Sequence, residues 1–291
     1  MFYGVYTALI TPFREGRLDE AALRRLVAWQ IEQGVQGLVA LGTTGEAPTV
    51  SADEYQRILR LVCEEAAGRV PVIAGATAND PREAIRYARD AEDAGADGLL
   101  AAAGYYNRPS QEGLYRHFEA LHEAVQLPLL IYNIPPRTIV EVTPETMARL
   151  ALLPRVVGVK DASGDLGRIS LERQRIGKAF SYFTGDDLTA LAYNAAGGGG
   201  CISVTANVAP ALCVQLQDAC RRHDYALALR LHEQLVPLHV ALFAEPNPAG
   251  IKYAASLLGL CDDGCRLPMV PLAEASQRSI RQAMLELHLL S

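Results

Sequence analysis

The sequence lacks the segments that carry a chain into or across a membrane. Residues 1–5 hold no charged stretch followed by a long apolar one, and no later apolar run approaches the roughly 20 residues that a membrane helix needs. The six cysteines include no CxxC pair, and a chain of this size does not depend on disulfides. We therefore expect a cytoplasmic protein with reduced cysteines and no membrane partner.

Concentrated positive charge is also missing. The formal net charge is −6, and the Lys and Arg residues are dispersed along the chain instead of forming a basic stripe. A nucleic-acid backbone binds to such stripes, so nucleic acid is not an expected partner. No G-x-G-x-x-G motif follows the first expected strand, so the chain has no dinucleotide-binding fingerprint there.

What the sequence does contain is a regular series of short apolar runs. The chain has 291 residues, 50% of them hydrophobic, which fits one large domain with an appendage. Amphipathic stretches at 20–32, 52–67, 82–94 and 114–124 lie between the early runs and predict helices. Strand candidates begin near eight positions: Val5, Gly37, Val70, Gly98, Pro128, Val156, Ser181 and Cys201.

This alternation favours a (β/α)8 TIM barrel with a C-terminal helical extension. Such barrels typically have about 250 residues, and here the eighth strand ends near Val204, which leaves a helical tail from about Pro210. We expect the barrel, with the active site, to span 1–225 and a helical domain to span 226–291. Ser51 and Ser110 precede acidic first turns and predict helix starts. A doubly wound open sheet is the alternative.

Two apolar runs end in residues that can do chemistry. Lys160 follows 156–159 and Tyr132 follows 129–131, so both side chains are expected at the carboxyl ends of strands. Most strand-end lysines extend into solvent, but at a dry barrel mouth desolvation lowers the pKa of the amine and favours a Schiff base. Tyr132 alone is as typical of a core tyrosine; its pairing with Lys160 indicates a proton relay.

The loop after the second expected strand reads Gly42-Thr43-Thr44-Gly45-Glu46. Its small residues let backbone N–H groups approach an anion, and its hydroxyls add donors. A carboxylate fits such a loop. Turns of this composition without a function are common, and the position after a barrel strand is what favours a binding site.

Further segments follow in order along the chain. They are 42–46, 105–115, 132–138, 158–162, 185–187, 202–207 and, in the tail, 245–248. Together they resemble the dihydrodipicolinate synthase family, which belongs to the pyruvate-dependent class I aldolase and N-acetylneuraminate lyase superfamily. The resemblance extends over nearly the whole chain.

The resemblance implies a lyase with 4-hydroxy-tetrahydrodipicolinate synthase activity, which condenses pyruvate with L-aspartate 4-semialdehyde in lysine and diaminopimelate biosynthesis. Lys160 would form a Schiff base with pyruvate, whose carboxylate would lie against Thr43 and Thr44. The resulting enamine would add to the aldehyde, and the amine of the second substrate would then cyclise and release Lys160. No metal and no organic cofactor is implied.

The same resemblance assigns further roles. Tyr132, Thr44 and Tyr106 match the proton-relay positions of the family, and Tyr106 is expected to reach into the active site of a neighbouring subunit. This implies a homo-oligomer, and a homotetramer built as a dimer of dimers is expected. Two more residues match positions that line the substrate site: Gly185 and Ile202.

Departures from the family pattern surround the expected site of the second substrate. Arg137 matches the residue that holds the carboxylate of the semialdehyde, a role that suits a guanidinium group. Pro136 stands where Ser or Gly is more common, and residues 101–104 stand where a Thr-Pro pair is usual. Because a displacement of about 1 Å is costly in a positioned site, either departure could change the preferred aldehyde.

A regulatory site is implied as well. Asn79, Glu83 and Tyr105 match the effector positions of lysine-sensitive family members. Fewer polar partners mean weaker binding, so we expect weak or absent inhibition by L-lysine. The residues that replace polar or imidazole groups there are Ala47, Pro48, Ala52 and Tyr55.

Other functions stay open at this point. A sister pyruvate-dependent aldolase or dehydratase acting on a sugar acid, sialic acid or hydroxy-oxo-acid would keep Lys160 and Tyr132. A silent barrel that binds a keto acid as a sensor would not need Lys160, Tyr132 and Thr44 intact. A metal-dependent class II aldolase is disfavoured, because no histidine stands at an expected strand end.

Overall fold

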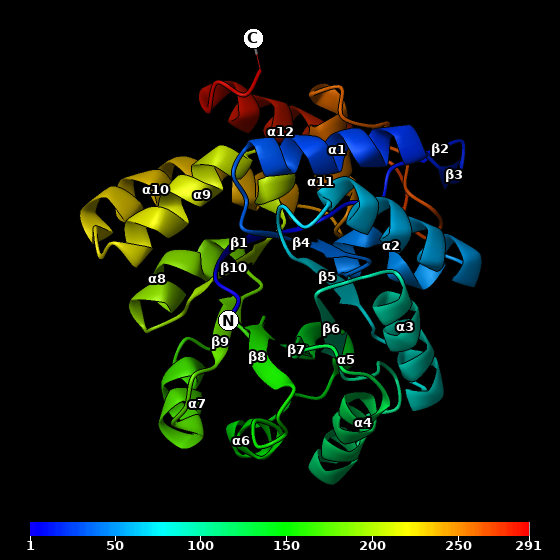
Figure 1. Cartoon of the computed structure of the whole chain (residues 1–291). Coiled ribbons are helices and arrows are strands. Elements are labelled where there is room, and N and C mark those ends of the chain that lie inside the picture. Colours follow the sequence, from blue (N-terminus) through cyan, green and yellow to red (C-terminus); the bar gives the residue numbers. More distant parts are fainter. Residues whose placement is uncertain (291) are drawn as a thin grey trace.

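Eight parallel strands close into a barrel with helices around its outside (Figure 1). The computed structural model describes residues 1–290. β1 pairs with both β4 and β10, which closes the barrel. The predicted (β/α)8 architecture is thus confirmed, and the open-sheet alternative is wrong. The barrel strands are β1 (Gly4–Ala8), β4 (Gly37–Ala40), β5 (Val72–Gly75), β6 (Gly98–Ala102), β7 (Leu129–Asn133), β8 (Val156–Asp161), β9 (Ser181–Thr184) and β10 (Gly200–Ser203).

Helices follow the strands and form the outer layer. A short hairpin, β2 (Phe13–Arg14) and β3 (Arg17–Leu18), precedes the first of them. The helices around the barrel are α1 (Glu20–Glu32), α2 (Ala52–Ala66), α3 (Pro81–Asp93), α4 (Gln111–Ala124), α5 (Pro135–Thr138), α6 (Pro144–Leu150), α7 (Arg168–Ile176), α8 (Ala190–Ala195) and α9 (Pro210–Arg221). Single 3-10 turns lie at η1 (Thr43–Gly45), η2 (Ala47–Thr49), η3 (Asp187–Thr189) and η4 (Thr205–Asn207).

Side-chain caps fix where the helices begin. The Ser51 hydroxyl accepts a hydrogen bond from the backbone N–H of Glu54, and the Glu54 carboxylate accepts one from the Ser51 N–H, which forms a complete capping box on α2. On α4 the Ser110 hydroxyl accepts one hydrogen bond, from the backbone N–H of Gly113. Both predicted helix starts are confirmed.

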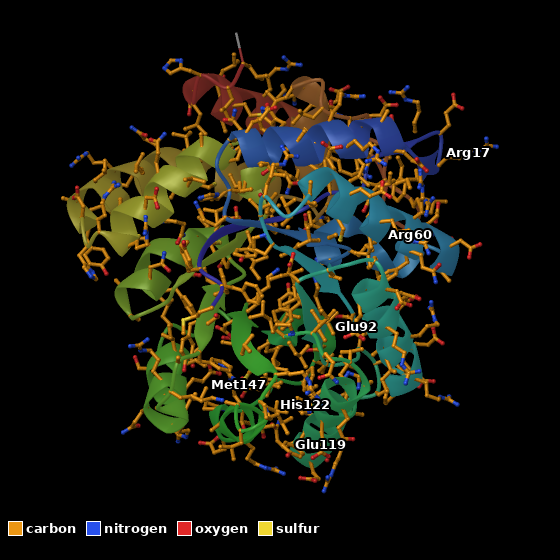
Figure 2. The ribbon with its side chains drawn as sticks, viewed as in Figure 1. Arg17, Arg60, Glu92, Glu119, His122 and Met147 are labelled. Atoms are coloured by element: carbon orange, nitrogen blue, oxygen red, sulfur yellow. The ribbon has the colours of Figure 1, made fainter. Side chains whose placement is uncertain are left out.

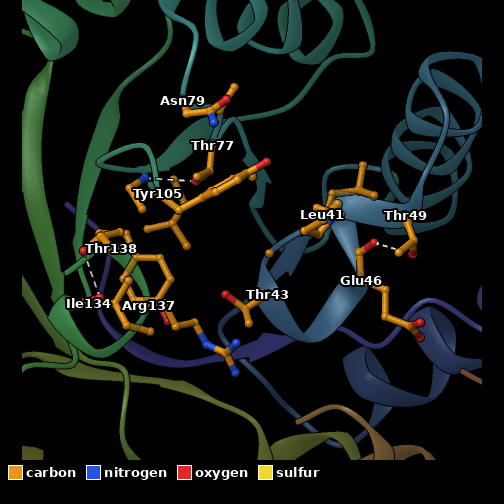
Figure 3. Close-up of a pocket in the computed structure, with 18 of the residues that line it drawn as sticks. Leu41, Thr43, Glu46, Thr49, Thr77, Asn79, Tyr105, Ile134, Arg137 and Thr138 are labelled. Carbon is orange, nitrogen blue, oxygen red and sulfur yellow. Dashed lines mark hydrogen bonds between the residues drawn. The ribbon is translucent and has the colours of Figure 1, made fainter. Parts of the chain in front are cut away.

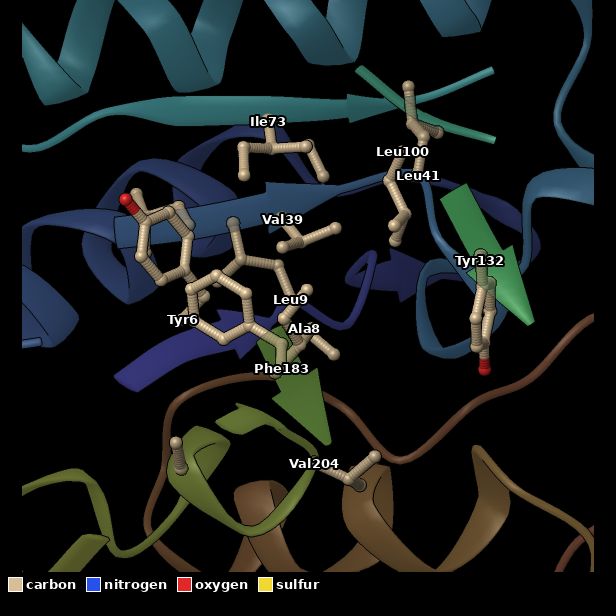
Figure 4. Packing of buried hydrophobic residues seen from close by; sticks show 14 of the residues in the cluster. Tyr6, Ala8, Leu9, Val39, Leu41, Ile73, Leu100, Tyr132, Phe183 and Val204 are labelled. Atoms are coloured by element: carbon tan, nitrogen blue, oxygen red, sulfur yellow. The ribbon is translucent and has the colours of Figure 1, made fainter. Parts of the chain in front are cut away.

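The barrel interior is filled with apolar side chains. Tyr6 of β1 and Phe183 of β9 meet edge to face with their ring centres 5.3 Å apart, while Tyr132 stands apart from them near the strand ends (Figure 4). Exposed charged side chains such as Arg17 and Arg60 point outward from the molecule (Figure 2). Because the core seals the inside of the barrel, polar chemistry is left to the loops at the carboxyl ends of the strands.

A helical extension follows the barrel, as predicted. It comprises α10 (Tyr225–Leu242), α11 (Ala249–Leu257) and α12 (Glu274–Glu286). Helix α10 packs against α9, and α12 packs against α10 and α11. The expected division between 225 and 226 falls at the first residue of α10 and stays a prediction. Within the described part of the chain, no helix is both long and apolar enough to span a bilayer.

Candidate active site

Lys160 and Tyr132 are neighbours at the carboxyl ends of β8 and β7. The two residues are paired in the register of these parallel strands. Their side chains are almost fully buried, with 5% and 7% exposure, and the Lys160 Nζ lies 4.3 Å from the centre of the Tyr132 ring. An amine and a phenol thus lie against one another on adjacent strands and face one site.

A hydrogen-bonded pair behind these residues joins the same two strands. The Asn133 Nδ2 donates to Asp161 Oδ1 at 3.0 Å, and the Val142 N–H donates to Asn133 Oδ1 at 3.0 Å. The Ser163 hydroxyl donates to the second Asp161 oxygen. Burial raises the pKa of Asp161, and the bonds from Asn133 and Ser163 oppose that rise. Since Asn133 and Asp161 directly follow Tyr132 and Lys160, the pair fixes the strand ends that carry these two side chains.

Gly185, at the end of β9, leaves the space that the lysine side chain occupies. A Cβ atom placed there would lie 2.6 Å from Lys160 Cε, closer than two carbons can approach without displacement. The Gly185 N–H also donates to the Asp161 carbonyl at 2.6 Å. Ile202 is fully buried in β10. The structure therefore places Gly185 in direct contact with Lys160.

The threonine loop, residues 42–46, forms one turn of 3-10 helix after β4. Thr44 is 3% exposed, and its Oγ1 accepts a hydrogen bond from the Nδ2 of Asn247 at 3.1 Å. The loop ends at Glu46, whose φ of 56° lies in the left-handed region. Asn247 was part of a motif noted in the sequence, but nothing in that motif indicated a contact with Thr44, 203 positions away.

A cavity of about 670 Å³ opens beside this group. Thr43, Tyr132 and Arg137 line it, whereas Lys160, Thr44, Gly185 and Ile202 are not among its lining residues. Figure 3 shows the Arg137 side chain extending from α5 toward the loop that carries Thr43. Arg137 is exposed and forms no salt bridge within residues 1–290, so its guanidinium group is available to an anion.

Tyr106 lies outside this cavity. Its side chain is 88% exposed, and its φ of 73° lies in the left-handed region, which is uncommon for a bulky residue. Tyr106 does not line the cavity of its own chain. The structure of one chain therefore does not bring together all of the residues expected in the proton relay.

The expected effector residues share the cavity with the substrate residues. Asn79, Glu83 and Tyr105 all line it. The Glu83 carboxylate already accepts from the Arg86 guanidinium at 2.8 Å. Tyr55, one of the four residues expected to replace polar or imidazole groups there, donates its hydroxyl to the Gly75 carbonyl at 2.9 Å. Because Glu83 and Tyr55 already have these partners, they offer fewer free donors and acceptors to a bound amino acid than unpaired side chains would.

Two departures from the family pattern have clear positions. Ala103 is buried in the cavity wall. A Cβ at Gly104 would lie 2.4 Å from the Asn79 Cα, so only glycine fits there. Pro136 is exposed in the first turn of α5, directly before Arg137.

Among residues 1–290, no group of three or more His, Cys, Asp or Glu side chains could hold a metal ion.

A (β/α)8 barrel with a buried lysine and tyrosine on adjacent strands, beneath a loop rich in hydroxyls, is the arrangement expected of the class I aldolases. The comparisons with known proteins agree with this class. The chain matches the model of the dihydrodipicolinate synthetase family over residues 1–287. It is 56% identical to the 4-hydroxy-tetrahydrodipicolinate synthase of Parvibaculum lavamentivorans, over 98% of both chains.

Solved structures extend the likeness to three dimensions. The chloride-inhibited dihydrodipicolinate synthase of Acinetobacter baumannii, in complex with pyruvate, is 41% identical and has a TM-score of 0.97 over 100% of both chains. The enzyme of Cyanidioschyzon merolae with lysine bound is 34% identical, with a TM-score of 0.97 over 99% of both chains. The present chain belongs to the dihydrodipicolinate synthetase family.

Proposed function

We propose that the protein is a 4-hydroxy-tetrahydrodipicolinate synthase that joins pyruvate to L-aspartate 4-semialdehyde. The observation that carries the proposal is the pairing of Lys160 with Tyr132 at the carboxyl ends of β8 and β7, in a chain of this family. The activity would serve lysine and diaminopimelate biosynthesis. Its cytoplasmic location remains a prediction.

The first half of the reaction builds a carbon nucleophile. The neutral Lys160 amine attacks the ketone carbon of pyruvate, and loss of one water leaves an iminium ion. Thr43 and Thr44 hold the carboxylate through the Thr43 hydroxyl and the backbone N–H donors of their loop, which leaves the Thr44 hydroxyl free for the proton relay. The iminium withdraws electrons, so a methyl C–H bond breaks and its electron pair forms the enamine. Tyr132 exchanges protons with the reacting atoms, since its ring lies beside the Lys160 nitrogen.

The second half joins the two substrates. The enamine carbon attacks the aldehyde of the semialdehyde and regenerates an iminium on Lys160, while a proton from the relay neutralises the new alkoxide. The substrate amine then attacks the iminium carbon, and the bond to Lys160 breaks to give the cyclic imine and the free enzyme. One water leaves in the whole sequence. Arg137, exposed and without an ion partner among the described residues, holds the second carboxylate.

Completion of the relay requires a second copy of the chain. Tyr106 is 88% exposed and lies outside the cavity of its own chain. We propose that it enters the site of a neighbouring subunit, where it joins Tyr132 and Thr44. The catalytic unit is then a dimer, and two dimers form the expected tetramer.

A comparison of second substrates tests the proposal. With pyruvate in excess, aspartate semialdehyde should give a kcat near the enzyme median of about 10 per second, and Lys160→Ala should abolish it. Hydroxy-oxo-acid and sugar-acid substrates should give far lower rates. The opposite order of rates would assign the chain to a sister aldolase, in which Pro136 and Ala103 have changed the aldehyde preference.

A further inference from the structure

The end of the threonine loop is tied to the C-terminal extension by a buried charge pair. Glu46 is 4% exposed, and both of its carboxylate oxygens are occupied. Oε1 lies 2.5 Å from the Nζ of Lys252 in α11, and Oε2 accepts from the backbone N–H of Arg266 at 2.9 Å. Figure 3 shows the Glu46 side chain directed away from Thr43 and Arg137.

Lys252 is enclosed completely. Its side chain is 0% exposed, and its Nζ donates to the Gly264 carbonyl at 2.6 Å in addition to Glu46. The same Nζ lies 4.4 Å from the centre of the Phe13 ring. A buried ammonium without its anion is strongly unfavourable, so Lys252 and Glu46 fix one another. The chain contains only three lysines, Lys160, Lys178 and Lys252, and Lys252 is the more deeply buried of the two outside the reaction.

A second contact from the extension reaches the same loop. Asn247 precedes α11 and donates its Nδ2 to Thr44 Oγ1 at 3.1 Å. Thr44 and Glu46, two residues apart, are thus both held by the segment that leads into and forms α11. Among residues 1–290, no salt bridge or buried hydrogen bond holds the Arg137 side chain, which also lines the cavity. The extension therefore acts on the part of the site that faces pyruvate.

We propose that Lys252 is a positioning residue for pyruvate binding, and that Asn247 orients the Thr44 hydroxyl for proton transfer. This inference rests on the proposed function. Without Lys252, the Glu46 carboxylate would be an uncompensated negative charge two residues from the donors that receive the pyruvate carboxylate, and like charges at that range repel. With Lys252 in place, the loop keeps its turn and presents Thr43 and Thr44 to an anion.

The two residues should affect different kinetic constants. The carboxylate of pyruvate is held before and during reaction, so losing its site raises KM with little change in kcat. Lys252→Met should raise KM for pyruvate at least about tenfold, with kcat within about threefold. Glu46→Gln combined with Lys252→Met removes both charges and should return KM to within about threefold of wild type. Asn247→Ala should lower kcat and leave KM nearly unchanged.

Asn194→Leu is the matched control. It breaks a buried 2.7 Å hydrogen bond to Gln217, between α8 and α9 and away from the threonine loop. We expect a lower melting temperature with unchanged KM. The inference is overturned if folded Lys252→Met keeps the wild-type KM, if Asn194→Leu raises KM equally, or if the double variant folds without recovery. If Lys252→Met does not fold, the double variant and Asn247→Ala decide the outcome.

Failure of this inference is distinguishable from failure of the proposed function. Borohydride reduction of wild-type protein with pyruvate reports the Schiff base independently of Lys252. If borohydride fixes pyruvate to the wild-type protein and Lys252→Met has the wild-type KM for pyruvate, only the positioning role is overturned. If borohydride fixes no pyruvate to the wild-type protein, the proposed function itself is overturned.

Discussion

At the scale of single residues, the reactivity of the site depends on space as well as on functional groups. Lys160 turns toward Tyr132 because Gly185 offers no side chain in its way. The Asn133–Asp161 bond then holds the two strand ends in register. The position of the Lys160 side chain thus depends on three residues, Gly185, Asn133 and Asp161, none of which is expected in the proton relay.

The space beside Lys160 can be tested directly. Gly185→Ala should lower kcat/KM for pyruvate at least about 100-fold, because a shift of about 1 Å in a reacting group costs that much. The Cβ would meet Lys160 Cε at 2.6 Å. Steady-state kinetics measure the loss, and a melting curve shows that the fold is kept.

Gly199→Ala provides the control for this prediction. A Cβ atom added there would have the Tyr182 carbonyl oxygen as its nearest neighbour, at 3.7 Å, which is an ordinary contact. The kcat/KM for pyruvate should therefore stay at the wild-type value. Equal activity of the Gly185→Ala and wild-type proteins would contradict the account of how Lys160 is placed.

The positions of Lys160 and Tyr132 at neighbouring strand ends could be predicted from the sequence, but the residues that support the site could not. Lys160 and Tyr132 end apolar runs, and parallel strands bring such ends together. Asn247 and Lys252 reach the threonine loop across 203 and 206 positions, and no local pattern encodes such pairings. A lysine in an apolar helix was the one available signal, and only the fold shows that Glu46 is its partner.

At the scale of elements, the extension is bound to the barrel by charges at the start of α2. Arg266 contacts the Glu54 carboxylate at 2.5 Å, and its Nη1 donates to the Thr49 carbonyl at 2.8 Å. Glu54 also belongs to the capping box of α2. The segment that carries Arg266 is therefore joined to the helix that follows the threonine loop.

The Glu54–Arg266 contact makes part of the stability depend on pH. The hydrogen bond from Arg266 lowers the pKa of Glu54 from 4.5 to about 2. A carboxylate with a lowered pKa contributes its full stability above the ordinary value and loses it as pH falls toward the lowered one. Glu54→Gln should cost about 1–2 kcal/mol at pH 7. The difference from wild type should shrink between pH 4.5 and about 2.

Denaturant unfolding of both proteins at a series of pH values measures this difference. Glu20→Gln is the control, because Glu20 pairs with Arg57 on the surface, where both side chains are nearly half exposed. Its effect should be smaller at every pH. A Glu54→Gln difference that stays constant as the solution is acidified would show that the contact does not stabilise the fold.

The strands and capped helices followed from their patterns, whereas the shorter elements did not. Ser51 and Ser110 predicted helix starts because a cap satisfies backbone donors locally. The hairpin β2–β3 and the four-residue helix α5 were not predicted, since two-residue strands and a Pro-Pro turn show no periodicity. Helix α5 nevertheless carries Arg137, so its geometry matters for the proposed binding of the second substrate.

At the scale of the whole molecule, the exposure of Tyr106 predicts that sites are shared between subunits. Lys160→Ala and Tyr106→Ala proteins should each be nearly inactive. After dissociation and reassembly of an equal mixture, about a quarter of wild-type activity should return, because half of the pairs are hybrids with one complete site. Steady-state rates before and after mixing measure the recovery. A mixture no more active than its parents would place Tyr106 outside the partner's site.

Inhibition by L-lysine, the end product of the proposed pathway, is the second property expected of the whole molecule. Glu83 is occupied by Arg86, and Ala47 and Pro48 offer no side-chain donors where the cavity passes the expected effector residues. We expect L-lysine to inhibit only weakly, at millimolar concentration or not at all. Initial rates at rising L-lysine concentration test this expectation, with D-lysine as the control. A micromolar inhibition constant would contradict it.

The central claim is that Lys160 forms a Schiff base with pyruvate and passes the carbon unit to aspartate semialdehyde. The decisive measurement is a chase: protein is loaded with pyruvate, freed of excess, exposed to the semialdehyde and then reduced with borohydride. Peptide mapping should place the adduct on Lys160, and not on Lys178 or Lys252, before the chase, and the semialdehyde should remove it within a turnover. An adduct on another lysine, or one that survives the chase, would contradict the account.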